Sequence, residues 1–180
     1  LRDSILAASE WIDDRMDGKS VPLRNQQFVF DHTSIDHTRY DSPRRTAYLP
    51  IIRNNLYTLL EQFDFPDPTM PTGHRQQTTV APQSLLLLNA ELVVNSADQL
   101  ASRLLLVAAE PTHRLDQMFV RLLSRPPTET ERQRCLSFVA QLTEERSRSA
   151  ATSVEVVTEE MAWALVVQAV IATSDFLYVR

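Results

Sequence analysis

Glycine is almost absent from this chain of 180 residues, which contains only Gly18 and Gly73. The usual share of glycine is about 7%. Dinucleotide fingerprints, phosphate-binding loops, kinase lids and nucleophile elbows all need clustered glycines, because the backbone there approaches a ligand closely or takes positive φ. Two isolated glycines cannot build any of these motifs, so the sequence excludes the function classes that depend on them.

Cysteine, lysine and long apolar runs are scarce as well. The single Cys135 has no disulfide partner within the chain, and its apolar neighbours in a helical pattern favour a place in the packed core. Lys19 is the only lysine, so arginine carries nearly all of the positive charge. No apolar run reaches the ~20 residues that a membrane-spanning helix needs, and no membrane span is predicted.

The charge balance is acidic, with a formal net charge of −5 at pH 7. This balance argues against a nucleic-acid partner. A local group of arginines nevertheless occurs in the first half of the chain, and arginine forks suit the recognition of carboxylate or phosphate. Solvated or internally paired side chains are the commoner outcome for such a group. Its members are Arg39, Arg44, Arg45, Arg53 and Arg75.

The N-terminal part alternates between amphipathic and irregular stretches. Apolar residues three or four apart predict a helix over residues 1–16. Residues 19–43 lose this periodicity and predict a long loop in which residues 28–30 are strand-like. Residues 46–49 precede a proline and are predicted to be extended, which allows a short two-stranded ribbon. Residues 51–63 again predict a helix.

From Pro82 onward the pattern is strongly helical. A first-turn proline opens one apolar helix at Pro82 and another helix at Pro111. Between them, Ser96 followed by Gln99 has the spacing of a capping box and predicts a separate helix start.

Two more helices complete the C-terminal part. Thr128 and Glu131 form a second predicted capping box. The last helix, over about residues 154–172, is apolar nearly all round, which is typical of a helix enclosed by its neighbours. Burial of Trp163 is therefore expected to anchor the core.

These patterns together predict a mainly α protein. The expected architecture is an irregular bundle of about six helices with a long N-terminal loop region and, as an option, the short two-stranded ribbon. The length suits a single domain over residues 1–180, with a loop-rich part at 1–75 and a helical part at 76–180. Because the chain begins at Leu1 rather than methionine, we expect it to be an excised or processed segment.

Several runs resemble a planctomycete-specific domain of unknown function, and the resemblance covers nearly the whole chain. Their order and spacing match those of the family. The runs are RRTAYLPIIRN at 44–54, FDFPDP at 63–68, TTVAPQSLLLLN at 78–89, LRDSILA at 1–7, FVRLLSRPPT at 119–128 and TSDFLYVR at 173–180.

The resemblance implies a setting and no chemistry. It implies a protein that is exported, to the periplasm or the cell surface, and that carries a cytochrome-c-like segment upstream. This chain would then be the C-terminal domain of a larger multi-domain protein. This chain has no Cys-x-x-Cys-His haem attachment pattern. No cofactor is therefore expected within it, and haem would lie on an upstream domain of the parent protein. The expected partners are upstream domains of the same polypeptide and other envelope proteins.

A polar stretch precedes the helix that opens at Pro82 and is the first candidate binding site. Placed ahead of a helix N-terminus, its side chains could hold an anion with help from free backbone donors and the helix dipole. The candidate residues are His74, Arg75, Thr78, Thr79 and Gln83.

A structural interpretation of the same stretch is favoured, because an apolar helix needs its end satisfied. One of the two threonines would cap the helix. Gln83 would bond to the preceding loop, and Arg75 would pair with Asp64 or Asp67 to hold the proline-rich link.

A weak metal motif lies in the predicted N-terminal loop. Two Asp-His pairs five residues apart offer nitrogen and oxygen ligands, with His32, Asp36 and His37 as the candidates. Loop Asp and His residues more commonly form local turns and face solvent, so we favour that interpretation.

The expected function is a non-catalytic binding or assembly module, and no catalytic residue is predicted. The alternative is a hydrolase-type enzyme acting on carbohydrate or other polymers, with a site near Asp64, Asp67, His74 and Arg75. A hydrolase needs paired carboxylates, or a nucleophile, base and acid that converge on a pocket. The spacing of these four residues does not single them out for such roles.

Overall fold

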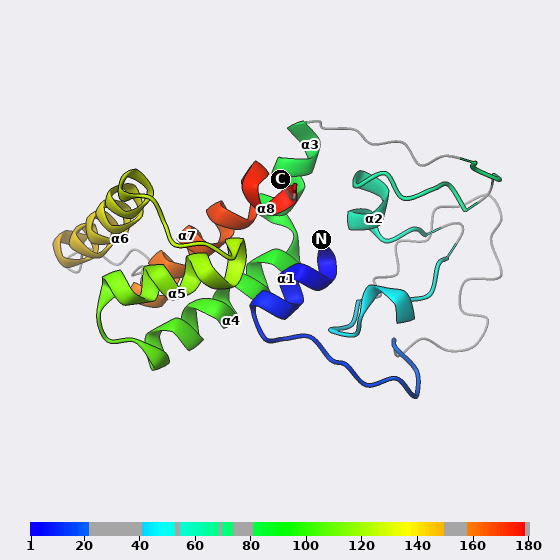
Figure 1. Cartoon of the computed structure of the whole chain (residues 1–180), viewed down its shortest axis with the longest axis horizontal. Coiled ribbons are helices and arrows are strands. Elements are labelled where there is room, and N and C mark those ends of the chain that lie inside the picture. The colour runs from blue at the N-terminus through cyan, green and yellow to red at the C-terminus, as the bar shows by residue number, and fades with distance from the viewer. Residues whose placement is uncertain (22–40, 53–54, 69, 74–80, 150–157, 179–180) are drawn as a thin grey trace. The chain divides into compact units, whose positions relative to one another are not determined.

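The computed structural model (Figure 1) shows a helical protein. Within the described residues there are eight α-helices, one short 3-10 helix and no β-strand. The predicted mainly α class is therefore confirmed. The described residues are 1–21, 41–52, 55–68, 70–73, 81–149 and 158–178. The elements are α1 (Arg2–Ala8), η1 (Thr46–Tyr48), α2 (Thr58–Gln62), α3 (Ala81–Asn89), α4 (Glu91–Val107), α5 (Pro111–Leu123), α6 (Glu129–Ser149), α7 (Glu159–Ile171) and α8 (Ser174–Leu177).

The chain divides into two compact units. The first unit contains Leu1, Asp3–Trp11 and Leu87–Arg180, and the second contains Arg2 and Ile12–Leu86. The single domain over residues 1–180, with a loop-rich part at 1–75 and a helical part at 76–180, stays a prediction.

The core of the first unit forms where α4 packs along α7 (Figure 1), which is the most extensive pairing among the described helices. Trp163 of α7 is completely buried there, together with Leu100 and Leu104 of α4. Removing such side chains from water contributes roughly 1.5–3 kcal/mol each. The predicted burial of Trp163 is confirmed.

One arginine joins three segments around this core. Arg114 of α5 is buried, and its guanidinium lies 5.8 Å from the ring centroid of Trp163. It donates hydrogen bonds to the carbonyl oxygens of Ala108 and Ala109, at 2.5 and 3.0 Å, just beyond the end of α4. It also pairs with Glu159 in the first turn of α7. These bonds satisfy carbonyls that a helix end otherwise leaves without partners.

The last long helix starts later than the sequence predicts and is less enclosed. Thr158 is its N-cap and accepts a hydrogen bond from the backbone N–H of Met161 at 3.1 Å, so α7 begins at Glu159. Residues 154–157 lie outside the described part. One side of α7 remains open to solvent, where Met161 and Leu165 are 47% and 43% exposed.

The first predicted helix ends eight residues early, at Ala8 instead of residue 16. A Schellman motif stops it, in which the N–H of Trp11 bonds to the carbonyl of Leu6 and that of Glu10 to the carbonyl of Ala7, at 2.9 and 3.0 Å. Glu10 takes the left-handed φ of 56° that this motif requires. The apolar spacing continues past the end, so periodicity alone could not find it.

The predicted helix start at Ser96 is wrong. Ser96 is buried inside α4, and the capping box with Gln99 does not form a helix end. The break lies at Ala90, which has an extended ψ of 126° and accepts hydrogen bonds from the N–H groups of Val93 and Val94. Ala90 has no capping side chain, whereas Ser96 serves as a small residue on the buried face.

The second unit contains a small apolar cluster instead of the long helix predicted over residues 51–63. Val21 and Leu49 are buried there, with Ile52 and Tyr57 packed against them. These tertiary contacts hold the preceding segment out of the helix, and α2 covers only Thr58–Gln62.

The segment predicted to be extended at residues 46–49 is mostly a 3-10 helix. Only Leu49 is extended, with φ −73° and ψ 140°, because the proline after it restricts this residue alone. No ribbon forms within the described residues, where an isolated bridge joins Asp13 and Arg44. The strand-like residues 28–30 lie outside them.

Among the residues whose backbone the structure describes, three other than glycine are left-handed: Glu10, Asp64 and Ser124, with φ of 56°, 58° and 54°. Each follows a helix, where glycine is the usual choice. The chain thus ends these helices at a conformational cost that glycine would avoid.

Replacing Ser124 by glycine is expected to raise the free energy of unfolding by about 0.5–1 kcal/mol, because the relief of left-handed strain exceeds the added freedom of the unfolded chain. Urea denaturation followed by circular dichroism measures the change. Ser124→Ala keeps the Cβ and serves as the control, expected within about 0.5 kcal/mol of the parent. An unchanged midpoint for Ser124→Gly would contradict the account of strain.

Candidate functional site

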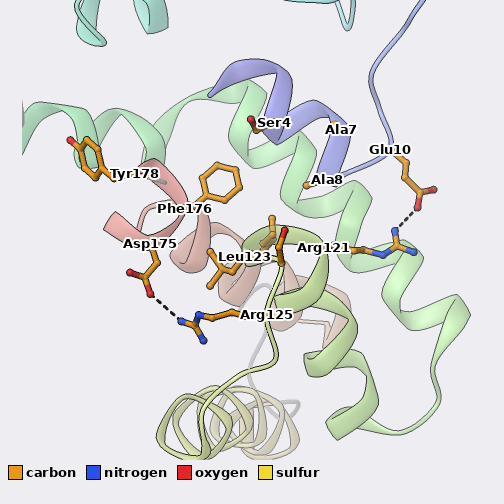
Figure 2. Close-up of a pocket in the computed structure, with 12 residues that line it drawn as sticks. Ser4, Ala7, Ala8, Glu10, Arg121, Leu123, Arg125, Asp175, Phe176 and Tyr178 are labelled. Atoms are coloured by element: carbon orange, nitrogen blue, oxygen red, sulfur yellow. Dashed lines mark hydrogen bonds and ion pairs between the residues drawn. The ribbon is translucent and has the colours of Figure 1, made fainter. Parts of the chain in front are cut away.

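The larger described pocket of the first unit lies between α1, the end of α5 and α8. Its volume is about 890 Å³. Figure 2 shows the Phe176 ring pointing into the space between α1 and Leu123, and Ser4 and Ala8 of α1 face it. The pocket is lined by Ser4, Ala7, Ala8, Glu10, Arg121, Leu122, Leu123, Ser124, Arg125, Asp175, Phe176 and Tyr178.

An ion pair stands on either side of this pocket (Figure 2). On one side, Glu10 pairs with Arg121 and also with Arg103 of α4. On the other, the guanidinium of Arg125 lies 3.0 Å from the carboxylate of Asp175. Each charged side chain that lines the pocket is therefore held by an opposite charge.

Arg125 is the centre of a larger network. Its guanidinium makes a two-pronged bond to Glu131, at 2.9 and 2.7 Å, and stacks 5.6 Å from the centroid of the Phe119 ring. The hydrogen bonds from Arg125 lower the pKa of Glu131 to about 2, and the bonds to Glu131 and Asp175 raise the pKa of Arg125. A carboxylate and a guanidinium held in this way keep their charges at neutral pH, so neither serves as a proton donor or acceptor there.

The predicted capping box at the start of α6 is part of the same network. The backbone N–H of Thr128 donates to Glu131 at 2.7 Å, and the N–H of Glu131 donates to the Thr128 hydroxyl at 3.3 Å. Glu131 thus fixes the helix start and the position of Arg125 together.

A second arginine-rich centre lies in the second unit. The buried guanidinium of Arg2 donates to the carbonyl of Arg44 at 2.8 Å and to the carboxylate of Asp41 at 2.7 Å. Tyr57 donates its hydroxyl proton to the other carboxylate oxygen at 2.8 Å. Burial, and then the charge of Asp41, raises the pKa of Tyr57. Arg2, Asp41 and Tyr57 thus bind one another, which gives this centre a structural character.

The profile of PSD1, described as a protein of unknown function (DUF1553), matches residues 1–139. The chain belongs to this family. The family resemblance predicted from the sequence is thereby confirmed over residues 1–139, and the run at 173–180 lies beyond the match. Neither the curated proteins nor the solved structures contain a significant match. Membership in PSD1 defines a family without assigning an activity.

Of the five predicted anion-site residues in this PSD1 chain, one can be placed. Gln83 is buried, and its side-chain amide donates to the carbonyl oxygen of Gln62 at 3.0 Å, at the end of α2. This bond agrees with the interpretation in which Gln83 holds the preceding segment. The other four, His74, Arg75, Thr78 and Thr79, lie outside the described residues.

The predicted metal and hydrolase sites are also largely outside the described part. His32, Asp36 and His37 fall in an undescribed stretch. Elsewhere in the chain, the residues with described positions contain no group of three or more potential metal ligands. Asp64 follows α2 in left-handed backbone and Asp67 is exposed. The hydrolase alternative stays a prediction.

Sequence reasoning missed the pocket at α1, α5 and α8. Glu10 and Arg121 are 111 positions apart and Arg125 and Asp175 are 50 apart, so no local spacing joins them. One signal was present in the sequence. Three of the family-like runs contribute residues that line this pocket, namely those at 1–7, 119–128 and 173–180. Among the described helices of the PSD1 chain, none is long and apolar enough to cross a bilayer.

Replacing Glu131 by glutamine is expected to lower the free energy of unfolding at pH 7 by about 0.5–1 kcal/mol, because the capping geometry survives and a partly exposed ion pair is lost. The lowered pKa of Glu131 stabilises the fold fully above the unfolded value of about 4.3, and this stabilisation is lost as pH falls through about 2. The variant should therefore lose less stability than the parent between about pH 5 and pH 2.

Urea denaturation at a series of pH values measures this difference. Glu129→Gln is a matched control, because Glu129 lies in the same first turn with a side chain that is 74% exposed. Its pH dependence should follow that of the parent. Parallel stability curves for the parent and Glu131→Gln would refute the role given to Glu131.

Proposed function

We propose that this PSD1 chain is a non-catalytic binding or assembly module of an exported, cytochrome-c-associated multi-domain protein. The pocket between α1, α5 and α8 receives a polypeptide segment from the upstream domains of the same protein. The observation that carries this proposal is the pocket's combination of accessible aromatic and arginine side chains with charges that are already paired.

Aromatic and arginine side chains are enriched at protein interfaces and at the positions that dominate binding energy. Phe176 is half-buried in the pocket and Tyr178 is 41% exposed at its edge. Both have large contact areas and few rotatable bonds, so little side-chain entropy is lost on binding. Arg121 and Arg125 are held in place by their acidic partners, which makes the surface pre-organised.

The same pairing argues against catalysis at this pocket. An acid or base catalyst needs a pKa near the working pH and access to the substrate. Arg125 and Glu131 are instead held charged by each other. Arg121 and Glu10 form a second ion pair. A binding role uses this arrangement as it stands.

The family resemblance supports the cellular setting that belongs to this proposal. In it, the parent protein lies in the periplasm or at the cell surface, haem lies on an upstream domain, and this chain holds no cofactor. Other envelope proteins are further partners.

The docking proposal predicts that the 180-residue chain binds the separately produced upstream region of its parent protein. Phe176→Ala and Tyr178→Ala should each weaken this affinity about tenfold or more, as expected for an aromatic side chain at the centre of an interface. Biolayer interferometry with the immobilised chain measures the dissociation constants.

Leu106→Ala is the control for that experiment, because Leu106 is 86% exposed near the end of α4 and does not line the pocket. Its affinity should equal that of the parent. Circular dichroism establishes that each variant is folded. Unchanged affinity in both folded pocket variants would rule out this pocket as the docking site.

The setting has its own test. The full-length parent protein, isolated from fractionated cells with an antibody against this domain, is expected in the envelope fraction and should stain for covalent haem. A haem-free or cytosolic band would reject the exported, cytochrome-associated setting and leave the pocket proposal standing by itself.

A further inference from the structure

A second cavity of the first unit lies between α5, α6 and α7 and differs in character from the first. Its volume is about 520 Å³. Apolar side chains supply most of its lining, including Phe119, Cys135, Phe138, Leu165 and Val166. Cavities of this size and composition are typical of sites that enclose small apolar ligands.

The side of α6 that borders this cavity is open, contrary to the expectation for Cys135. The sequence favours a core position for Cys135, whereas its side chain is only half-buried. Phe138 on the same helix is 41% exposed, and Leu165 across the cavity on α7 is 43% exposed. Three apolar side chains from two helices thus meet at an opening that is accessible to solvent.

Some of the charged side chains around the cavity form ion pairs and one does not. Glu131 and Asp175 line it, and both are bound to Arg125. Arg134 also lines it and is exposed, and no acidic side chain in the described part of the chain pairs with it. Among the charged residues described around this cavity, Arg134 is therefore the one whose guanidinium N–H groups have no acidic partner.

We propose that this cavity binds a free fatty acid, with the acyl chain between α6 and α7 and the carboxylate on Arg134. A guanidinium fork matches a carboxylate in a two-pronged, charge-assisted bond. The apolar lining removes the chain from water, and the gain grows with each buried methylene group. This proposal does not rest on the polypeptide pocket, although Leu123 and Asp175 line both cavities.

Cys135 provides a direct reporter, because it is the only cysteine and lines the cavity. Dodecanoate, used below its micelle concentration, should slow alkylation of Cys135 in the intact 180-residue chain at least tenfold at saturation. Burial already raises the pKa of this thiol, so the rate is compared at one fixed alkaline pH. Isothermal titration calorimetry gives the dissociation constants.

Two variants separate the carboxylate contact from the chain contact. Arg134→Gln should weaken dodecanoate binding about tenfold and leave dodecanol binding unchanged. Ala169→Phe fills the cavity, because Ala169 lines it, and should abolish the binding of both. Ala140→Phe is the control, since Ala140 is exposed on α6 and does not line the cavity.

A cation with the same chain, dodecyltrimethylammonium, tests the sign of the charge and should protect Cys135 at least tenfold less well than dodecanoate. Equal or better protection by the cation would overturn the assignment to Arg134. Undiminished dodecanoate binding by a folded Ala169→Phe variant would overturn the assignment to the cavity.

Discussion

The packing of α4 against α7 around Trp163 is the interaction on which the first unit depends. Trp163 is completely buried, and Arg114 covers its ring while bonding the carbonyls at the end of α4. A buried guanidinium is costly unless its donors are used. Here they fix where α4 ends, where α5 lies and where α7 begins. Both cavities are lined in part by α5, the helix that carries Arg114.

The scarcity of glycine determines how several helices of this chain end. Glu10, Asp64 and Ser124 follow helices in the left-handed conformation, which residues other than glycine adopt at a cost. At Glu10 the same residue supplies a carboxylate to both Arg103 and Arg121. A glycine would end the helix more cheaply and would remove that ionic link. The backbone cost is thus offset by a contact that only a side chain can make.

Local rules predicted the elements whose causes are local. The first-turn proline of α5 and the Thr128–Glu131 capping box lie where the sequence placed them. The helix predicted over residues 51–63 failed because Tyr57 packs against a cluster that no local pattern contains. Family membership could be predicted from long sequence motifs. The pocket between α1, α5 and α8 could not be predicted, because its ion pairs join residues that are far apart in the sequence.

Leu123 and Asp175 line both cavities of the first unit. The two spaces therefore have a common wall, built from the end of α5 and the start of α8. A ligand that displaces this wall from one side changes the volume available on the other. Equilibrium linkage makes such an effect reciprocal, so a segment bound on one side would alter the affinity for an acyl chain by the same factor as the reverse. The short helix α8 would then couple the two binding equilibria.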